Sequence, residues 1–135
     1  GVSDTTMFLL DFKSSEAAAS SNSDVEAMES LQLWVYALAA QKIVPDFAKK
    51  TVVLGYVVLD DPLKSNLLFM DEGTMSKVRS AKLCRTKMLA EAFVESMTAA
   101  KDKINELAQT IKNDGEFTAK PRKLKNCDYC ELARV

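Results

Sequence analysis

Short continuous runs of apolar positions predict buried strands in the first half of the chain. The apolar run 7–10 leads into residues 11–13 and is too short for a helix, which favours a strand buried on both faces. Residues 51–59 are rich in β-branched side chains and predict a second buried strand. Residues 66–70 predict a short third strand, antiparallel to the second. We therefore expect a small sheet.

Apolar side chains at three- and four-residue intervals predict two longer helices. The first covers about 24–42 and stops before Pro45. The second covers about 85–113 and ends before Gly115. A helical turn is expected near 75–80. The order of strand, helix, two strands and long helix predicts an α/β layer arrangement.

The composition excludes several kinds of functional site. The chain has 135 residues, of which 47% are hydrophobic and 27% charged, an ordinary globular composition. Eighteen Lys and Arg against nineteen Asp and Glu leave a net charge of -1, so net charge gives no support for a nucleic-acid partner. The chain has no histidine, which excludes a Ser-His-Asp triad and a His-ligated zinc site within it. Its apolar runs are far shorter than a membrane span, and we expect no membrane partner.

Three cysteines bear on the redox setting and on metal binding. An odd set favours a reducing, cytoplasmic location over a secreted disulfide framework. Cys127 and Cys130 form a CxxC motif in the tail 116–135, which is basic through 120–125. This motif suits a metal or a redox pair but supplies only two of the four ligands that a structural metal site needs. Cys84 is expected to be a small buried hydrophobe.

Asp11-Phe12-Lys13 is the first candidate for chemistry. Alternate residues of a strand point to the same face, so Asp11 and Lys13 should project together. Burying either charge is costly unless it is paired or binds a ligand. The functional interpretation is a divalent-metal ligand beside a lysine that activates water or offsets negative charge. The alternative, a solvated ion pair at a strand end, is favoured when this spacing is taken alone.

Gln32 and Tyr36 form the second candidate. They lie four positions apart and so share one face of the first predicted helix. Together they could donate to a phosphate or hold a catalytic carboxylate. The alternative is the polar flank of a half-buried helix. Trp34, between them, is expected to pack in the core.

Taken in order, these segments resemble one protein family. A strand ending in DFKSS, a Ser-rich loop, the string LQLWVYALAA, a hairpin, a long helix and the terminal CDYC are similar to the RecB-type nuclease domain of the PD-(D/E)XK superfamily. The likeness is greatest to the RecB-family or AddB-like exonucleases that carry an iron–sulfur staple, and covers about 7–135. It implies a truncated restriction-endonuclease-like α/β core, with a small mixed sheet flanked by helices. Residues 1–135 would form one partial nuclease domain, the C-terminal part of that core.

The resemblance implies a role for each candidate. Asp11 and the backbone carbonyl of Phe12 would bind Mg²⁺ or Mn²⁺. Lys13 would be the catalytic lysine, and Gln32 and Tyr36 would orient it or a phosphate. The family's first acidic metal ligand belongs to a preceding strand that we do not find before residue 7. We therefore expect this segment alone to have little or no activity.

The resemblance also implies a cofactor and partners. Cys127 and Cys130 would be two ligands of a 4Fe–4S cluster that staples the fold. The function implied is a metal-dependent DNA exonuclease, a hydrolase of DNA repair and recombination, acting on DNA with a helicase or nuclease partner subunit. A homodimer through an exposed sheet edge is a further expectation. The alternatives are a non-catalytic scaffold module of a helicase–nuclease complex, and a chance match in which Asp11 and Lys13 point apart or Gln32 and Tyr36 face solvent.

Overall fold

The computed structural model describes residues 5–69, 84–87 and 90–114. The strands are β1 (Thr6–Lys13), β2 (Thr51–Val58), β3 (Asn66–Phe69) and β4 (Cys84–Lys87), and the helices are α1 (Asn22–Glu26), α2 (Gln32–Ile43) and α4 (Ala90–Asp114). Two compact units divide the chain, 1–105 and 106–135, and α4 runs from the first into the second. The sheet, the core and the candidate site all belong to the first unit.

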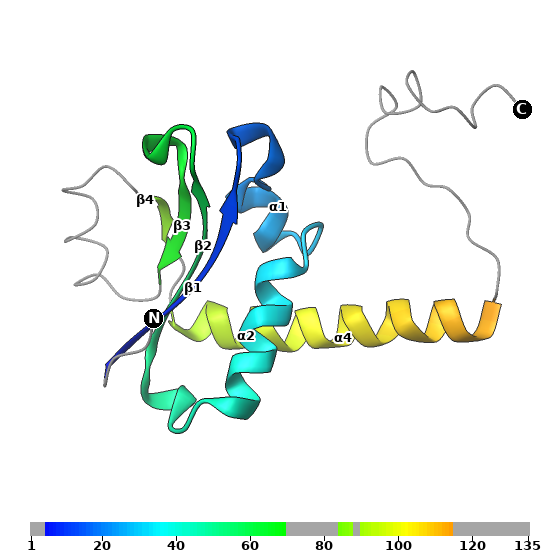
Figure 1. Ribbon diagram of the computed structural model, residues 1–135. Coiled ribbons are helices and arrows are strands. Elements are labelled where there is room, and N and C mark those ends of the chain that lie inside the picture. Colours follow the sequence, from blue (N-terminus) through cyan, green and yellow to red (C-terminus); the bar gives the residue numbers. More distant parts are fainter. Residues whose placement is uncertain (1–4, 70–83, 88–89, 115–135) are drawn as a thin grey trace, which may run out of the picture. The chain divides into compact units, whose positions relative to one another are not determined.

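The four strands form one mixed sheet in the order β1-β2-β3-β4 (Figure 1). β1 and β2 are parallel, β2 and β3 antiparallel, and β3 and β4 parallel. The expected small mixed sheet flanked by helices is confirmed. The prediction that the long helix begins near residue 85 is wrong, because residues 84–87 pair with β3 instead. Apolar helical spacing starts only after this segment, so backbone pairing decides its structure.

β1 is buried on one face, and the expectation of burial on both faces is wrong. Met7 is fully buried, whereas Phe12 is 62% exposed. β1 lies at the end of the strand order, and successive side chains of a strand point to opposite faces. The face that carries Met7 also carries Asp11 and Lys13, which places the two charges at the edge of the core.

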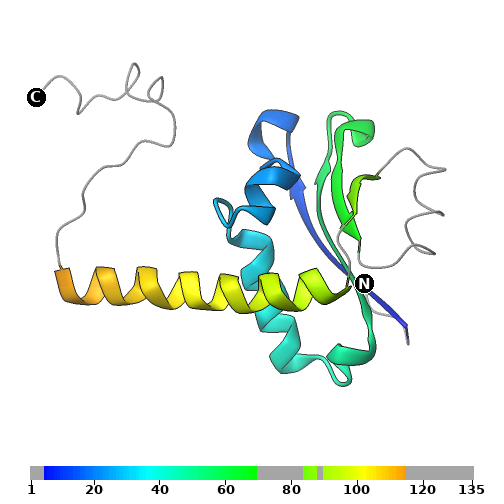
Figure 2. The same cartoon turned by 180° about the vertical axis from the view of Figure 1, so that it is seen from behind.

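Helices α2 and α4 cover that face of the sheet and cross one another in both views (Figures 1 and 2). Trp34 of α2 is fully buried, as expected, and its ring centroid lies 5.7 Å from that of Phe93 in α4. The indole Nε1 donates to the carbonyl of Val25 at 2.7 Å, which satisfies its polar atom. Core residues of the two helices and the sheet thus form one cluster that fixes α2 against β1.

The first predicted helix is interrupted in the structure. Residues 24–42 were expected to form one helix, but α1 ends at Glu26 and α2 begins at Gln32. Met28 between them has a left-handed backbone with φ 59°, which ends the helix. The N-cap of α1 is Ser21, which forms a capping box with Asp24. This interruption brings Gln32 to the first turn of α2, beside the end of β1.

Some expectations lie outside the described residues. They include the helical turn near 75–80, the stop at Gly115 and the whole tail 116–135 with its CxxC motif. Within the part of the chain that the structure describes, no helix has the length and apolar character needed to cross a bilayer.

Candidate active site

The four polar residues singled out in the sequence meet where β1 ends. Asp11 and Lys13 belong to β1, and Gln32 and Tyr36 to α2. Lys13 Nζ lies 2.9 Å from Asp11 Oδ2, so the alternative in which the two side chains point apart is excluded. Their side chains are only 24% and 17% exposed. The pair is therefore partly buried at the edge of the core.

The side-chain amide of Gln32 connects the other three groups. Its Oε1 accepts from Lys13 Nζ at 3.1 Å, and its Nε2 donates to Asp11 Oδ1 at 3.2 Å. The same Nε2 donates to the hydroxyl of Tyr36 at 3.0 Å. Lysine can only donate and an ionised carboxylate can only accept, so just one orientation of the amide suits both neighbours. Tyr36 in turn donates its hydroxyl hydrogen to Asp11 Oδ1 at 3.3 Å.

The two oxygens of Asp11 have different surroundings. Oδ1 accepts from Gln32 and Tyr36. Oδ2 is buried, and its neighbour is the Lys13 ammonium, with Nζ at 2.9 Å. One ammonium N–H occupies at most one of the two lone pairs of this oxygen, so the other remains for a cation. A buried carboxylate oxygen in this state is suited to a cation.

The residues present fit one side of a divalent-metal site. The carbonyls of Thr5 and Lys13 accept from β2 at 2.8 and 2.9 Å. Backbone groups alternate sides along a strand, so the carbonyl of Phe12 faces away from β2, towards the edge of the sheet. A carboxylate and a carbonyl are hard oxygen donors of the kind that Mg²⁺ and Mn²⁺ accept. Among the described residues no group of three or more His, Cys, Asp and Glu lies together.

The charge state of Lys13 follows from its neighbours. The hydrogen bond to the Asp11 carboxylate raises the pKa of Lys13 above its ordinary value, and partial burial opposes that rise without reversing it. Lys13 is therefore an ammonium group at neutral pH. It can donate to a phosphate oxygen and offset negative charge, but it does not have the depressed pKa of a general base.

Tyr56 and Ser30 belong to the same cluster, and the sequence analysis missed both. In the parallel register Tyr56 of β2 stands opposite Asp11. Lys13 Nζ lies 5.4 Å from the centroid of its ring, and its hydroxyl is 3.1 Å from Ser30 Oγ. The sequence held one signal: a tyrosine within a strand of buried β-branched residues needs a partner for its hydroxyl. Neither the lysine nor the serine could be identified as a neighbour without the register.

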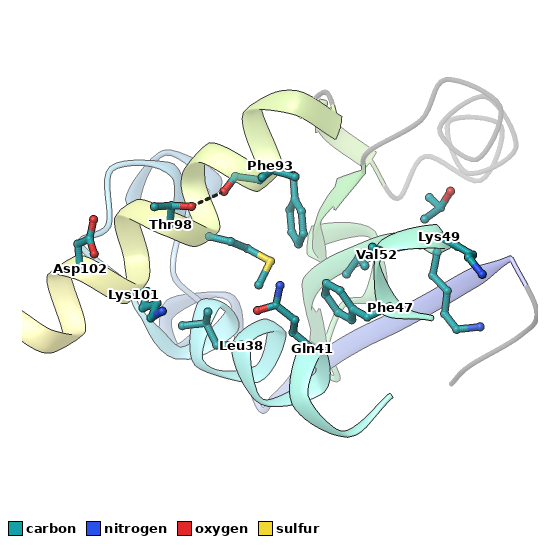
Figure 3. A pocket seen from close by; sticks show the side chains of 14 residues that line it. Leu38, Gln41, Phe47, Lys49, Val52, Phe93, Thr98, Lys101 and Asp102 are labelled. Carbon is teal, nitrogen blue, oxygen red and sulfur yellow. Dashed lines mark hydrogen bonds between the residues drawn. The ribbon is translucent and has the colours of Figure 1, made fainter. Parts of the chain in front are cut away.

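A pocket of about 600 Å³ lies elsewhere in the first unit (Figure 3). Its lining includes Leu38, Phe47 and Phe93, from α2, the 3₁₀ turn Phe47–Lys49 and α4. It also includes Val52, near the start of β2, whereas Lys13 is at the end of the parallel strand β1. The pocket and the polar cluster are thus at opposite ends of these strands. None of the predicted site residues lines the pocket.

The predicted cysteine site cannot be placed. Cys127 and Cys130 lie outside the described residues. Cys84 lies in β4, where the structure describes only the backbone.

The family model of the PD-(D/E)XK nuclease superfamily matches residues 2–135, almost the entire chain. No curated protein and no solved structure matches significantly.

Proposed function

The chain belongs to the PD-(D/E)XK nuclease superfamily, and on that premise we propose that the protein hydrolyses phosphodiester bonds of DNA with the help of Mg²⁺ or Mn²⁺. One observation carries the proposal. Asp11, Lys13, Gln32 and Tyr36 form a single hydrogen-bonded cluster at the end of β1, in which Oδ2 of the carboxylate is contacted by the Lys13 ammonium.

Each side chain has a task that its geometry supports. Asp11, through Oδ2, and the carbonyl of Phe12 would hold the divalent ion. When bound, that ion supplies Lewis-acid activation of the phosphate and of a water molecule. Lys13 donates to the scissile phosphate and offsets the negative charge that grows on it. Gln32 keeps Lys13 and Asp11 at a fixed separation, and Tyr36 holds the carboxylate from its other side.

The finer assignment is a RecB-family exonuclease of DNA repair and recombination, located in the cytoplasm and working with a helicase or nuclease subunit. Its support is the order and spacing of DFKSS and LQLWVYALAA. The position of β1 at the end of the strand order supports a homodimer through that edge as one way of completing the sheet. Two substrates distinguish the kinds of nuclease. An exonuclease releases mononucleotides from the termini of end-labelled linear DNA and leaves circular DNA intact, whereas an endonuclease also cuts circular DNA.

The first prediction tests the metal ligand in the longest form of the protein that its gene encodes. Asp11→Asn keeps the size of the side chain but removes the charge that attracts the cation. We expect Mg²⁺- or Mn²⁺-dependent DNA cleavage to fall by about 100-fold or more, measured as release of acid-soluble nucleotides.

Asp46→Asn is the matched control for that experiment. Asp46 lies beyond α2, pairs with the exposed Lys49 and has a left-handed backbone that asparagine also adopts. The control should cleave as the wild type does. Equal cleavage by wild type and Asp11→Asn would remove Asp11 from the metal site. DNA cleavage absent from the wild type as well would favour the non-catalytic scaffold.

We also propose that Cys127 and Cys130 supply two ligands of a 4Fe–4S cluster. The CxxC spacing supports this, since such clusters are held by cysteine thiolates with that local spacing. Protein purified without oxygen should contain iron and acid-labile sulfide, and Cys127→Ser should lose both. Wild-type protein free of iron would contradict the cluster and leave the nuclease proposal untouched.

A further inference from the structure

We propose that Tyr56 is a positioning residue that holds Lys13 for reaction, and that Ser30 fixes Tyr56 in place. The inference rests on the proposed nuclease function, in which Lys13 contacts the phosphate. It concerns two residues outside the cluster of four, one on β2 and one in the segment between α1 and α2.

The ammonium group of Lys13 has three close neighbours. Asp11 Oδ2 lies at 2.9 Å, Gln32 Oε1 at 3.1 Å and the ring centroid of Tyr56 at 5.4 Å. A cation within about 6 Å of a ring centroid is attracted by the negative face of that ring. An ammonium has three N–H donors, of which two point to Asp11 and Gln32. The aromatic face supports the cation without taking up the third N–H, which is left for a phosphate oxygen or a water.

The ring contact differs from the carboxylate contact in one respect. A divalent ion on Asp11 would share the carboxylate with Lys13 and weaken that ion pair. The ring of Tyr56 binds no hard cation of this kind, so its hold on Lys13 is independent of the metal. Lysine also has a long flexible side chain, whose rotamer freedom must be restricted for a fixed geometry. Tyr56 and Gln32 together provide that restriction.

The ring is itself held rigidly. Tyr56 is 1% exposed, and its hydroxyl is paired with Ser30 Oγ at 3.1 Å. The backbone N–H of Ser30 donates to the carbonyl of Asp24 at 3.0 Å, just after the left-handed Met28. The segment between α1 and α2 is therefore tied to β2 directly beneath the lysine. This contact satisfies the phenol hydroxyl, which would otherwise be buried without a partner.

The experiment separates the ring from its hydroxyl. Tyr56→Phe keeps the aromatic face, and Tyr56→Leu removes it. We expect kcat of Tyr56→Leu to fall about 10-fold with KM within about twofold of wild type. Tyr56→Phe should stay within about threefold, which is rescue by the conservative variant. Leu54→Val, a core change on the same face of β2, is the control for loss of packing and should leave kcat unchanged.

A second readout does not depend on activity. The ε-methylene resonances of Lys13, assigned with Lys13→Arg and recorded at neutral pH, report the surroundings of the ammonium directly. At neutral pH, removal of the ring in Tyr56→Leu should move the Lys13 resonances, because the shielding by the aromatic face is lost, whereas Tyr56→Phe should leave them near their wild-type positions. If the Lys13 resonances are identical in wild type and Tyr56→Leu, the positioning role is wrong. If the wild type does not cleave DNA but these resonances move as expected, the proposed function fails while the contact stands.

The contact can also be measured from the lysine side, should Tyr56→Leu not fold. Lys13→Met should move the ring-proton resonances of Tyr56, and the surface variant Lys64→Met should not. Ser30→Ala should leave the ring over Lys13 but increase its rate of flipping. Ring resonances unaltered by Lys13→Met would overturn the proposal.

Discussion

Each of the four polar side chains at the end of β1 is satisfied mainly by the other three. The carboxylate of Asp11 and the ammonium of Lys13 would be costly to bury singly, and together with the amide of Gln32 they form a compact neutral network. The two-residue spacing of Asp11 and Lys13 and the four-residue spacing of Gln32 and Tyr36 were visible in the sequence. That the two pairs meet depends on how α2 packs against β1, which spacing does not specify.

Loss of the central amide should affect both stability and catalysis. In Gln32→Ala, Asp11 and Tyr36 lose a donor and Lys13 loses an acceptor, so we expect about 1 to 3 kcal/mol less stability. Cleavage should fall at least about 10-fold, because Lys13 can then collapse fully onto the carboxylate. Denaturant unfolding and steady-state kinetics measure the two effects. Gln41→Ala, an exposed glutamine of the same helix, should change neither, and similar losses in both variants would contradict a special role for Gln32.

The ion pair should give stability a defined dependence on pH. The pKa of Lys13 is raised in the folded protein, so the stabilisation is complete below the ordinary lysine pKa of about 10.4 and is lost as pH rises through the higher folded value. The difference in unfolding free energy between wild type and Lys13→Met should be constant from about pH 6 to 9 and shrink above about pH 10.4. Urea titrations across this range measure it. A difference that already shrinks near neutral pH would contradict a charged Lys13.

At the scale of single elements, the interruption between α1 and α2 sets the geometry of the site. A continuous helix over 24–42 would carry Gln32 at its middle, whereas the structure makes it the first residue of α2. The apolar spacing of this region was sufficient to predict helical structure. The break was not predictable, because methionine carries no preference for the left-handed conformation that Met28 adopts. β4 was not predicted for a related reason. Its pairing with β3 makes it a strand, and its own sequence pattern does not indicate one.

The capping box at the start of α1 should be measurable in stability. Ser21 Oγ accepts from the backbone N–H of Asp24 at 3.2 Å. Ser21→Ala should therefore lower the unfolding free energy by about 1 kcal/mol, determined by chemical denaturation. The neighbouring Ser20→Ala should have an effect below about 0.5 kcal/mol. An equal loss in both variants would argue against the cap.

On the scale of the whole first unit, one apolar cluster joins the sheet, α2 and the first part of α4. Most residues of this cluster lie on the three predicted strands or at the apolar positions of α4, so the sequence was sufficient to predict that they are buried. The sequence could not show that Trp34 and Phe93 face one another, since the residues are far apart along the chain. The same packing leaves a pocket at one end of the strands and the polar cluster at the other.

Truncation of a core ring tests this arrangement. Phe93→Ala should lower the unfolding free energy by about 3 to 5 kcal/mol, because Phe93 is only 3% exposed. Trp34 is the single tryptophan of the chain, so its fluorescence reports the packing directly and should shift to longer wavelength. Val94→Ala, on an exposed position of the same helix, should change stability by less than about 0.5 kcal/mol. Unaltered emission in Phe93→Ala would contradict the ring contact.

The parallel pairing of β1 with β2 has a consequence for the order in which activity appears. Asp11 and Tyr56 become neighbours only after all of residues 14–50 have closed the connection between the strands. Such distant contacts form late in folding, because the entropy of the intervening loop must be lost first. A chain in which β1 and β2 have not yet paired therefore lacks the contacts that hold Lys13. Under the proposed function, DNA cleavage is therefore confined to molecules that have completed their fold.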